Sequence, residues 1–189
     1  MPHINLDNDG FGIMSLFEYR PETALPLSEL AEMLLRGPSP LTRGDRELIA
    51  SYVSSLNDCS FCTDSHAAFA ALQLPGGLTL VDQVRADPGS APISAKLRAL
   101  LAVAAAVQRG GKHVSAQDVE DARQAGADDQ EIHDTVLIAA AFCMYNRYVD
   151  GLATTRPADR SDYAMVAEVI VNHGYLAGLP APAQAPLPS

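Results

Sequence analysis

The segment of residues 42–74 constrains the fold because it contains two helical patterns with almost no chain between them. Apolar residues recur at helical spacing over about residues 43–56, and a second pattern runs from Cys59 to a Pro-Gly pair that ends it. Asn57 and Asp58 separate the two patterns, and both residue types cap helix N-termini well. The sequence therefore predicts two consecutive helices, with the second beginning at the cysteines.

Two cysteines, Cys59 and Cys62, stand three positions apart at the start of this second helix. On a helix such positions lie about 5 to 6 Å apart, which is close enough for a disulfide. A cysteine in the first helical turn lies at the positive end of the helix dipole, so the pattern favours Cys59 as the more acidic thiol. His66 follows Cys62 by one turn, and one helix face therefore carries both sulfurs and an imidazole.

Glu47 in the first helix has two possible environments. It lies opposite the apolar stripe of its helix, which by itself indicates a carboxylate in solvent. Its own face, however, is made of small residues that would let a second helix approach closely and enclose the carboxylate beside His66; these are Gly44, Ala50, Ser51 and Ser54. We favour the enclosed arrangement, which helical periodicity alone does not establish.

The spacing of these four residues resembles that of a known family. Glu47 precedes the Cys-x-x-Cys motif by twelve residues and His66 follows Cys62 by four, as in the AhpD-like alkylhydroperoxidases of the carboxymuconolactone decarboxylase superfamily. The segments LNDCSFCTDSH and NRYVDGL are similar to the peroxidase-related branch, and SAKLRALLAVAAAV resembles the repeated helical core of the superfamily. The resemblance implies an all-α, AhpD-like helical bundle of about eight helices.

The resemblance also implies a thiol-dependent peroxidase that reduces organic hydroperoxides or hydrogen peroxide. In the family pattern Cys62 attacks the peroxide, whereas Cys59 resolves the oxidised sulfur and receives electrons from an external dithiol reductant. His66 is placed to accept the thiol proton and return it to the leaving alkoxide, and Glu47 would orient that imidazole. No heme, flavin, bound metal or other cofactor is expected.

One position departs from the family pattern. Some AhpD proteins carry a second His immediately before the second Cys, and this chain has Phe61 there. Because a proton donor is missing, we expect either weaker peroxidase turnover or a substrate of different shape.

Other functions remain compatible with the motif. One is a dithiol-disulfide oxidoreductase whose substrate is a disulfide and not a peroxide. Another is a zinc-stabilised or redox-sensing oligomer without turnover, because Cys59, Cys62 and His66 supply three of the about four ligands that structural zinc takes. Carboxymuconolactone decarboxylase activity is a weaker alternative, since those relatives do not depend on a Cys-x-x-Cys.

Composition excludes several classes of partner. A net charge of −10 and a pI near 4.7 would repel a phosphate backbone, so nucleic acid is not an expected partner. The longest apolar runs are about ten residues, half of what a bilayer requires, so no membrane association is expected.

The first residues lack a signal-peptide pattern, and three cysteines with one Cys-x-x-Cys fit a reducing compartment. We therefore expect a cytoplasmic protein.

The rest of the chain is predicted to be helical between two ends without helical pattern. Residues 1–26 are interpreted as an extended N-terminal arm, residues 27–178 as the helical domain and residues 179–189 as a Pro/Ala-rich tail. Further helices are expected over residues 28–36, 77–86, about 92–109, 115–126, 129–154 and 161–173. The helix at 129–154 is apolar nearly all round, which predicts a central position.

The resemblance implies a homo-oligomer, since members of the superfamily form dimers, trimers and hexamers. The N-terminal arm could wrap a neighbouring subunit. Asn146, Arg147 and Asp150 follow an apolar run and are expected either to line the site or to lie at a subunit interface, of which we favour the interface. Cys143 lies within that run and is predicted to be a small buried hydrophobic residue.

Overall fold

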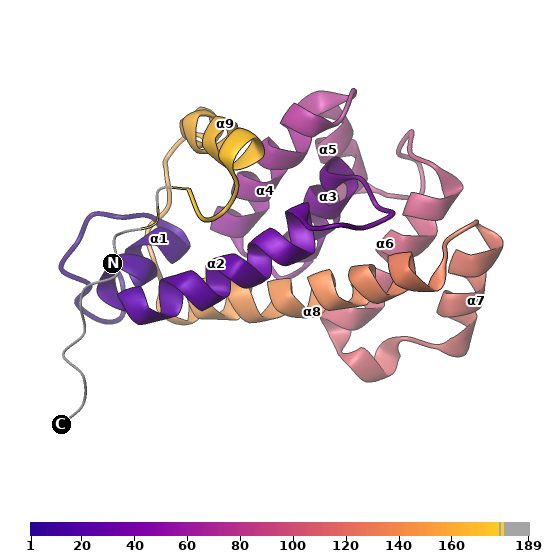
Figure 1. The fold of residues 1–189 in the computed structure, drawn as a ribbon, viewed down its shortest axis with the longest axis horizontal. Helices are drawn as coiled ribbons and strands as arrows, with labels where there is room; N and C mark the ends of the chain where they lie inside the picture. Colours follow the sequence, from indigo (N-terminus) through magenta and orange to yellow (C-terminus); the bar gives the residue numbers. More distant parts are fainter. Residues whose placement is uncertain (178, 180–189) are drawn as a thin grey trace.

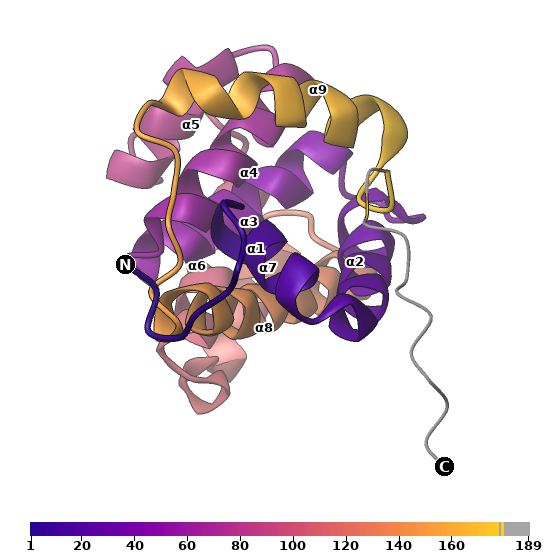
Figure 2. The same ribbon diagram turned by 90° about the vertical axis from the view of Figure 1, so that its left-hand side faces the viewer.

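The computed structural model describes residues 1–177 and residue 179, and this part of the chain contains helices and no strand (Figures 1 and 2). The all-α prediction is confirmed. The α-helices are α1 (Gly12–Tyr19), α2 (Pro21–Arg36), α3 (Arg43–Leu56), α4 (Ser60–Gln73), α5 (Gly77–Ala86), α6 (Ala95–Arg109), α7 (Ala116–Gln124), α8 (Asp129–Gly151) and α9 (Ala164–His173). Two short 3₁₀ helices, η1 (Gly111–His113) and η2 (Arg160–Tyr163), precede α7 and α9.

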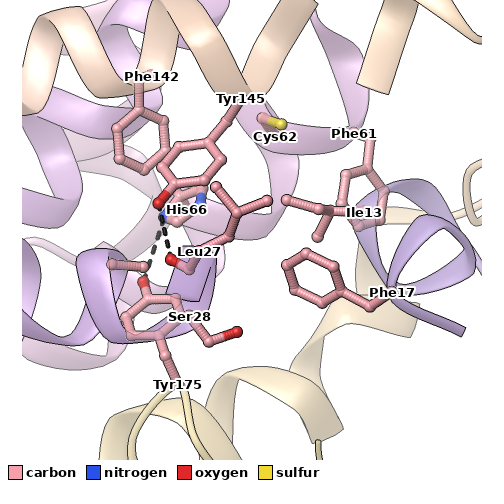
Figure 3. A pocket seen from close by; sticks show the side chains of 11 residues that line it. Ile13, Phe17, Leu27, Ser28, Phe61, Cys62, His66, Phe142, Tyr145 and Tyr175 are labelled. Carbon is pink, nitrogen blue, oxygen red and sulfur yellow. Dashed lines mark hydrogen bonds between the residues drawn. The ribbon is translucent and has the colours of Figure 1, made fainter. Parts of the chain in front are cut away.

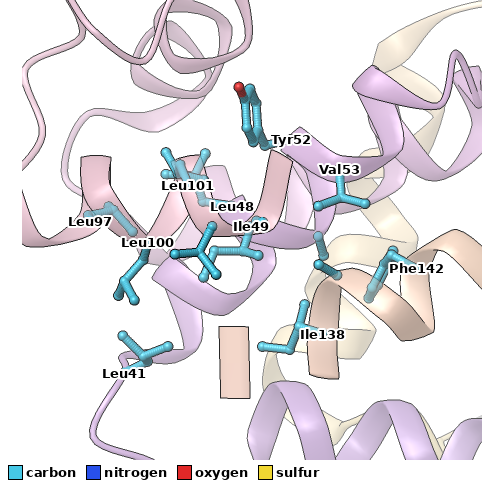
Figure 4. Close-up of a cluster of buried hydrophobic side chains, with 14 of the residues drawn as sticks. Leu41, Leu48, Ile49, Tyr52, Val53, Leu97, Leu100, Leu101, Ile138 and Phe142 are labelled. Carbon is cyan, nitrogen blue, oxygen red and sulfur yellow. The ribbon is translucent and has the colours of Figure 1, made fainter. Parts of the chain in front are cut away.

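The centre of the molecule is α3, not α8 as the sequence predicted. Every residue of α3 from position 46 to position 54 is buried, because α4, α6 and α8 surround it. In the core, apolar side chains of α3 pack against α6 and α8 (Figure 4); they include Leu48, Ile49, Val53, Leu100, Leu101, Ile138 and Phe142. Helix α8 instead leaves Leu137 and Met144 exposed, so its uniform apolar composition does not reflect burial on all sides.

Hydrogen-bonding side chains cap the N-termini of several helices. Thr42 accepts a hydrogen bond from the backbone N–H of Asp45 at the start of α3, and Asp128 forms a reciprocal capping box with Glu131 at the start of α8. The junction of α3 and α4 differs from the expectation. Asp58 adopts a left-handed conformation with φ +57°, and Cys59 becomes the N-cap residue of α4. The helix therefore starts one residue later than predicted.

The N-terminal region is not the extended arm that was predicted for residues 1–26. It contains α1 and the beginning of α2, which starts at Pro21 and not at residue 28. Proline is well tolerated at the first position of a helix, and a further proline, Pro26, lies inside α2. Both views place α1 and α2 between α8 and α9 at one end of the bundle (Figures 1 and 2). This region therefore covers part of the helical core. The predicted Pro/Ala-rich tail, apart from Leu179, lies outside the described residues.

Helix α1 approaches α4 closely at Gly12. This glycine has φ +52°, and a Cβ atom there would overlap the ring of Phe61. Only a residue without a side chain fits this backbone conformation at this distance.

We expect Gly12→Ala to destabilise the protein by about 1–3 kcal/mol, because the methyl group must displace the Phe61 ring and the backbone must leave its left-handed conformation. Gly151→Ala is the matched control: the residue lies in the last turn of α8 and nothing approaches the added methyl group within 4 Å. Its free energy of unfolding should be unchanged or slightly higher. Urea denaturation measures both, and equal stability of the two variants would contradict the close approach.

Candidate active site

The small-residue face of α3 lies directly against α4. At Gly44 an added Cβ would come within 2.8 Å of the Leu74 side chain, and the Ser51 hydroxyl donates to the Thr63 carbonyl oxygen at 3.0 Å. Glu47, on the same face, is only 1% exposed. The enclosed arrangement that we favoured for this carboxylate is confirmed, and solvent exposure is excluded within the described chain.

Glu47 is held by two hydrogen bonds inside this contact. Its Oε2 atom lies 2.7 Å from Nδ1 of His66, and its Oε1 atom accepts a hydrogen bond from the Tyr175 hydroxyl at 2.6 Å. A carboxylate only accepts hydrogen bonds, so Nδ1 of His66 carries the proton and Nε2 is left as an acceptor. Burial of the Tyr175 hydroxyl, followed by the charge of Glu47, raises the pKa of Tyr175 well above its ordinary value. The phenol therefore stays protonated and continues to donate.

Aromatic rings hold the imidazole of His66 in place. The Phe142 ring meets it edge-on at 4.5 Å between centroids, and the Phe69 ring does so at 5.1 Å. The Tyr175 ring stacks on it at 6.2 Å with 19° between the planes. These contacts and the bond to Glu47 restrict the ring to one orientation.

The two cysteines occupy different positions in α4. Cys59 is the N-cap residue and is fully buried, whereas Cys62 is the third residue of the helix and lies in its first turn. Hydrogen bonding to Cys62, followed by burial, raises the pKa of the Cys59 thiol far above its ordinary value. The neighbouring sulfur and burial therefore both oppose the effect that the helix dipole was expected to have on the Cys59 thiol.

Cys62 and His66 open onto the same small cavity, which has a volume of about 70 Å³ (Figure 3). The remaining walls are mainly apolar and come from α1, α2, α4, α8 and the segment after α9; they comprise Ile13, Phe17, Leu27, Ser28, Ala31, Phe61, Phe142, Tyr145 and Tyr175. Among the described residues no direct hydrogen bond joins the Cys62 sulfur to His66. Because both side chains line the cavity, a molecule held there can contact the thiol and the imidazole.

Asp150, at the end of α8, interacts with Cys59. Desolvation raises the pKa of this carboxyl group, and a hydrogen bond to Cys59 partly opposes that rise. Its neighbour Asn146 is buried and donates to the Ser54 hydroxyl at 3.0 Å. Of the two positions considered for these residues, the site and a subunit interface, the contacts within the chain place both next to the α3–α4 junction, close to the site.

Two further residues at the site were missed by the sequence analysis. Tyr175 and Phe142 contact His66. Phe142 carries no motif, because its role depends on where α8 lies against α4. Tyr175 follows α9 and likewise carries no signal of its own in the sequence.

The third cysteine, Cys143, is less enclosed than predicted. It is half-buried, and its sulfur accepts a 3.6 Å hydrogen bond from Asn57.

Metal ligands and membrane-spanning helices were also considered. Within the described residues no group of three or more His, Cys, Asp and Glu side chains is placed to hold a metal ion. The same part of the chain has no helix with the length and apolar character needed to span a bilayer.

Comparison with known proteins agrees with this site. Residues 21–73 and 78–156, which together make up more than half of the chain, match the model of the carboxymuconolactone decarboxylase family. The chain belongs to this family. Cys59, Cys62, His66 and Glu47 all lie within the matched segments. None of the curated proteins matches the chain.

Solved structures with the same fold reinforce the family assignment. An uncharacterized peroxidase-related protein from Silicibacter sp. TM1040 is 28% identical, with a TM-score of 0.72 over 80% of this chain and 78% of that one. A second uncharacterized peroxidase-related protein, with an alkylhydroperoxidase AhpD core and from Ralstonia eutropha JMP134, is 24% identical, with a TM-score of 0.71 over 83% and 80% of the two chains. The AhpD-like fold that the sequence predicted for this family member is therefore confirmed.

We expect iodoacetamide to modify Cys62 before Cys59 between pH 7 and 9, because a raised pKa leaves less of the Cys59 thiolate at each pH. One tryptic peptide, residues 47–85, contains both cysteines, so fragment ions that separate them must be counted by mass spectrometry. Cys143 lies on another tryptic peptide and provides the internal reference. Faster modification of Cys59 than of Cys62 would contradict the assigned order.

Proposed function

We propose that this protein is a thiol-dependent peroxidase that reduces hydroperoxides through a Cys59/Cys62 dithiol-disulfide cycle. The observation that carries the proposal is the buried Glu47–His66 pair. His66 lines the same cavity as Cys62, so the paired imidazole and the thiol face one space. A base, a thiol and space for a small substrate are the elements that this chemistry requires.

In the first step the Cys62 thiol gives its proton to Nε2 of His66, and the thiolate attacks the distal oxygen of the hydroperoxide. The O–O bond breaks, an S–O bond forms, and Cys62 becomes a sulfenic acid. The leaving alkoxide takes the proton from the imidazolium and departs as an alcohol, or as water when the substrate is hydrogen peroxide. Glu47 stabilises the imidazolium while it exists.

In the second step Cys59 attacks the sulfenic sulfur and a disulfide forms with release of water. An external dithiol then reduces the disulfide by two electrons and is itself oxidised, which restores both thiols. The sulfurs are almost completely enclosed, with Cys59 0% and Cys62 4% exposed. Such enclosure favours a peroxide group, which can enter the cavity, as the oxidant over the disulfide of a folded protein.

Tyr175 acts in this proposal as a positioning residue. It holds Oε1 of Glu47 so that Oε2 faces His66, and it reaches the reacting atoms only through them. The second His of some relatives is replaced by Phe61, which supplies an apolar wall to the cavity and packs on Tyr163 at 5.9 Å.

Replacing Cys62 by Ser should abolish consumption of tert-butyl hydroperoxide in an assay with dithiothreitol, and His66→Asn should lower kcat/KM by about 100-fold through loss of the base. Cys143→Ser is the control and should retain full activity, because that sulfur lies outside the cavity. Full turnover by the Cys62→Ser protein would exclude the proposed mechanism.

Replacing Tyr175 by Phe keeps the ring and removes one hydrogen bond to the Glu47 carboxylate. We expect kcat/KM to fall about tenfold, in line with the loss of a hydrogen bond to a charged acceptor. Tyr148→Phe, on α8 and outside the cavity, should leave kcat/KM unchanged. An unchanged kcat/KM in the Tyr175 variant would leave Tyr175 with a packing role only.

A further inference from the structure

A second apolar depression adjoins the cavity that contains Cys62. It lies between α1 and α9 and has a volume of about 260 Å³. Three residues, Phe17, Ser28 and Tyr175, line both spaces, so the outer groove leads toward the thiol. Figure 3 shows these three side chains at the end of the inner cavity away from Cys62. The outer wall includes Met14, Met165 and Val169.

We propose that the outer groove binds the hydrocarbon chain of a long-chain alkyl or acyl hydroperoxide while its peroxide group occupies the inner cavity at Cys62. This inference rests on the proposed peroxidase function and specifies the substrate class of the same site. It does not follow from that function, since a peroxidase for hydrogen peroxide would need the inner cavity alone.

The volumes of the two spaces support this division. On the same measure the inner cavity has about 70 Å³ and the outer groove about 260 Å³. The smaller inner space suits the hydroperoxide group and the carbon that bears it. A long hydrocarbon chain attached to that carbon would extend past Phe17, Ser28 and Tyr175 into the larger outer groove.

The chemistry of the walls also fits a hydrocarbon chain. Among the residues that the structure describes, no Asp, Glu, Lys or Arg lines either space. In the outer groove the polar side chains are Ser28 and Tyr175, both at the junction, and the Tyr175 hydroxyl is already bonded to Glu47. Met165 is 79% exposed and Val169 is 38% exposed, so apolar surface is available for a ligand. Hydrogen peroxide would gain nothing from this surface, whereas each methylene group buried there adds affinity.

The test compares linear alkyl hydroperoxides from ethyl to octyl. In the wild-type protein kcat/KM should rise with chain length, by up to about fourfold for each methylene group that the groove buries. Val169→Asp places a charge in the groove and should remove this gain, measured as the ratio of kcat/KM for octyl to that for ethyl hydroperoxide. The control is Leu137→Asp, an equally exposed apolar position on α8 outside both spaces, and its ratio should equal that of the wild type.

The outcomes distinguish the two proposals. Reduction of every hydroperoxide with the same kcat/KM would overturn the groove assignment and leave the peroxidase function standing. Absence of turnover with every hydroperoxide of the series and with hydrogen peroxide would refute the peroxidase function itself. A lower molar mass of the Val169→Asp protein than of the wild type in light scattering would show that the groove is an interface between copies, which also overturns the assignment. If Val169→Asp fails to fold, Met165→Asp replaces it, because Met165 is too exposed to affect the core.

Discussion

The hydrogen bond between Glu47 and His66 is the interaction on which the rest of the site depends. A carboxylate that is 1% exposed is stable only if its oxygens are satisfied, and here His66 and Tyr175 bond one oxygen each. The bond spans two helices, so it forms only where α3 and α4 approach closely, as at Gly44 and Ser51. The small residues of α3 thus serve the chemistry directly, because bulkier ones would separate the carboxylate from the imidazole.

The cavity is completed by residues outside the family match. Cys59, Cys62, His66 and Glu47 all lie within residues that match the family model, which spans 21–73 and 78–156. Most of the cavity walls, from α2, α4 and α8, lie there as well, whereas Ile13 and Phe17 of α1 and Tyr175 after α9 lie outside that match. The two flanking segments therefore contribute walls to the cavity but neither the thiol nor the imidazole.

Much of the fold and of the site could be predicted, because the signals were local. Thr42 and the capping box at Asp128 mark helix starts through bonds within a few residues, and the spacing of Cys62 and His66 already places them on one helix face. Predictions failed where distant contacts decide the outcome. Residues 1–26 read as an extended arm because of their Gly and Pro, yet Gly12 is needed for the approach to Phe61 and Pro21 begins α2. Tyr175 lies 128 residues from Glu47, a separation at which no periodicity can indicate a contact.

The unequal environments of the two sulfurs bear on the timing of the proposed cycle. The raised pKa of Cys59 comes first from its hydrogen bonding to Cys62, so it depends on the chemical state of that partner. In the cycle that we propose, Cys62, which faces the cavity, meets the peroxide, while Cys59 is fully buried. Oxidation of Cys62 to a sulfenic acid would replace the partner that holds the proton on Cys59, so we expect Cys59 to act as a nucleophile only after the peroxide has reacted. Burial of Cys59 and the charge of Asp150 oppose its ionisation, so the proposed resolving step depends on the close approach of the two sulfurs.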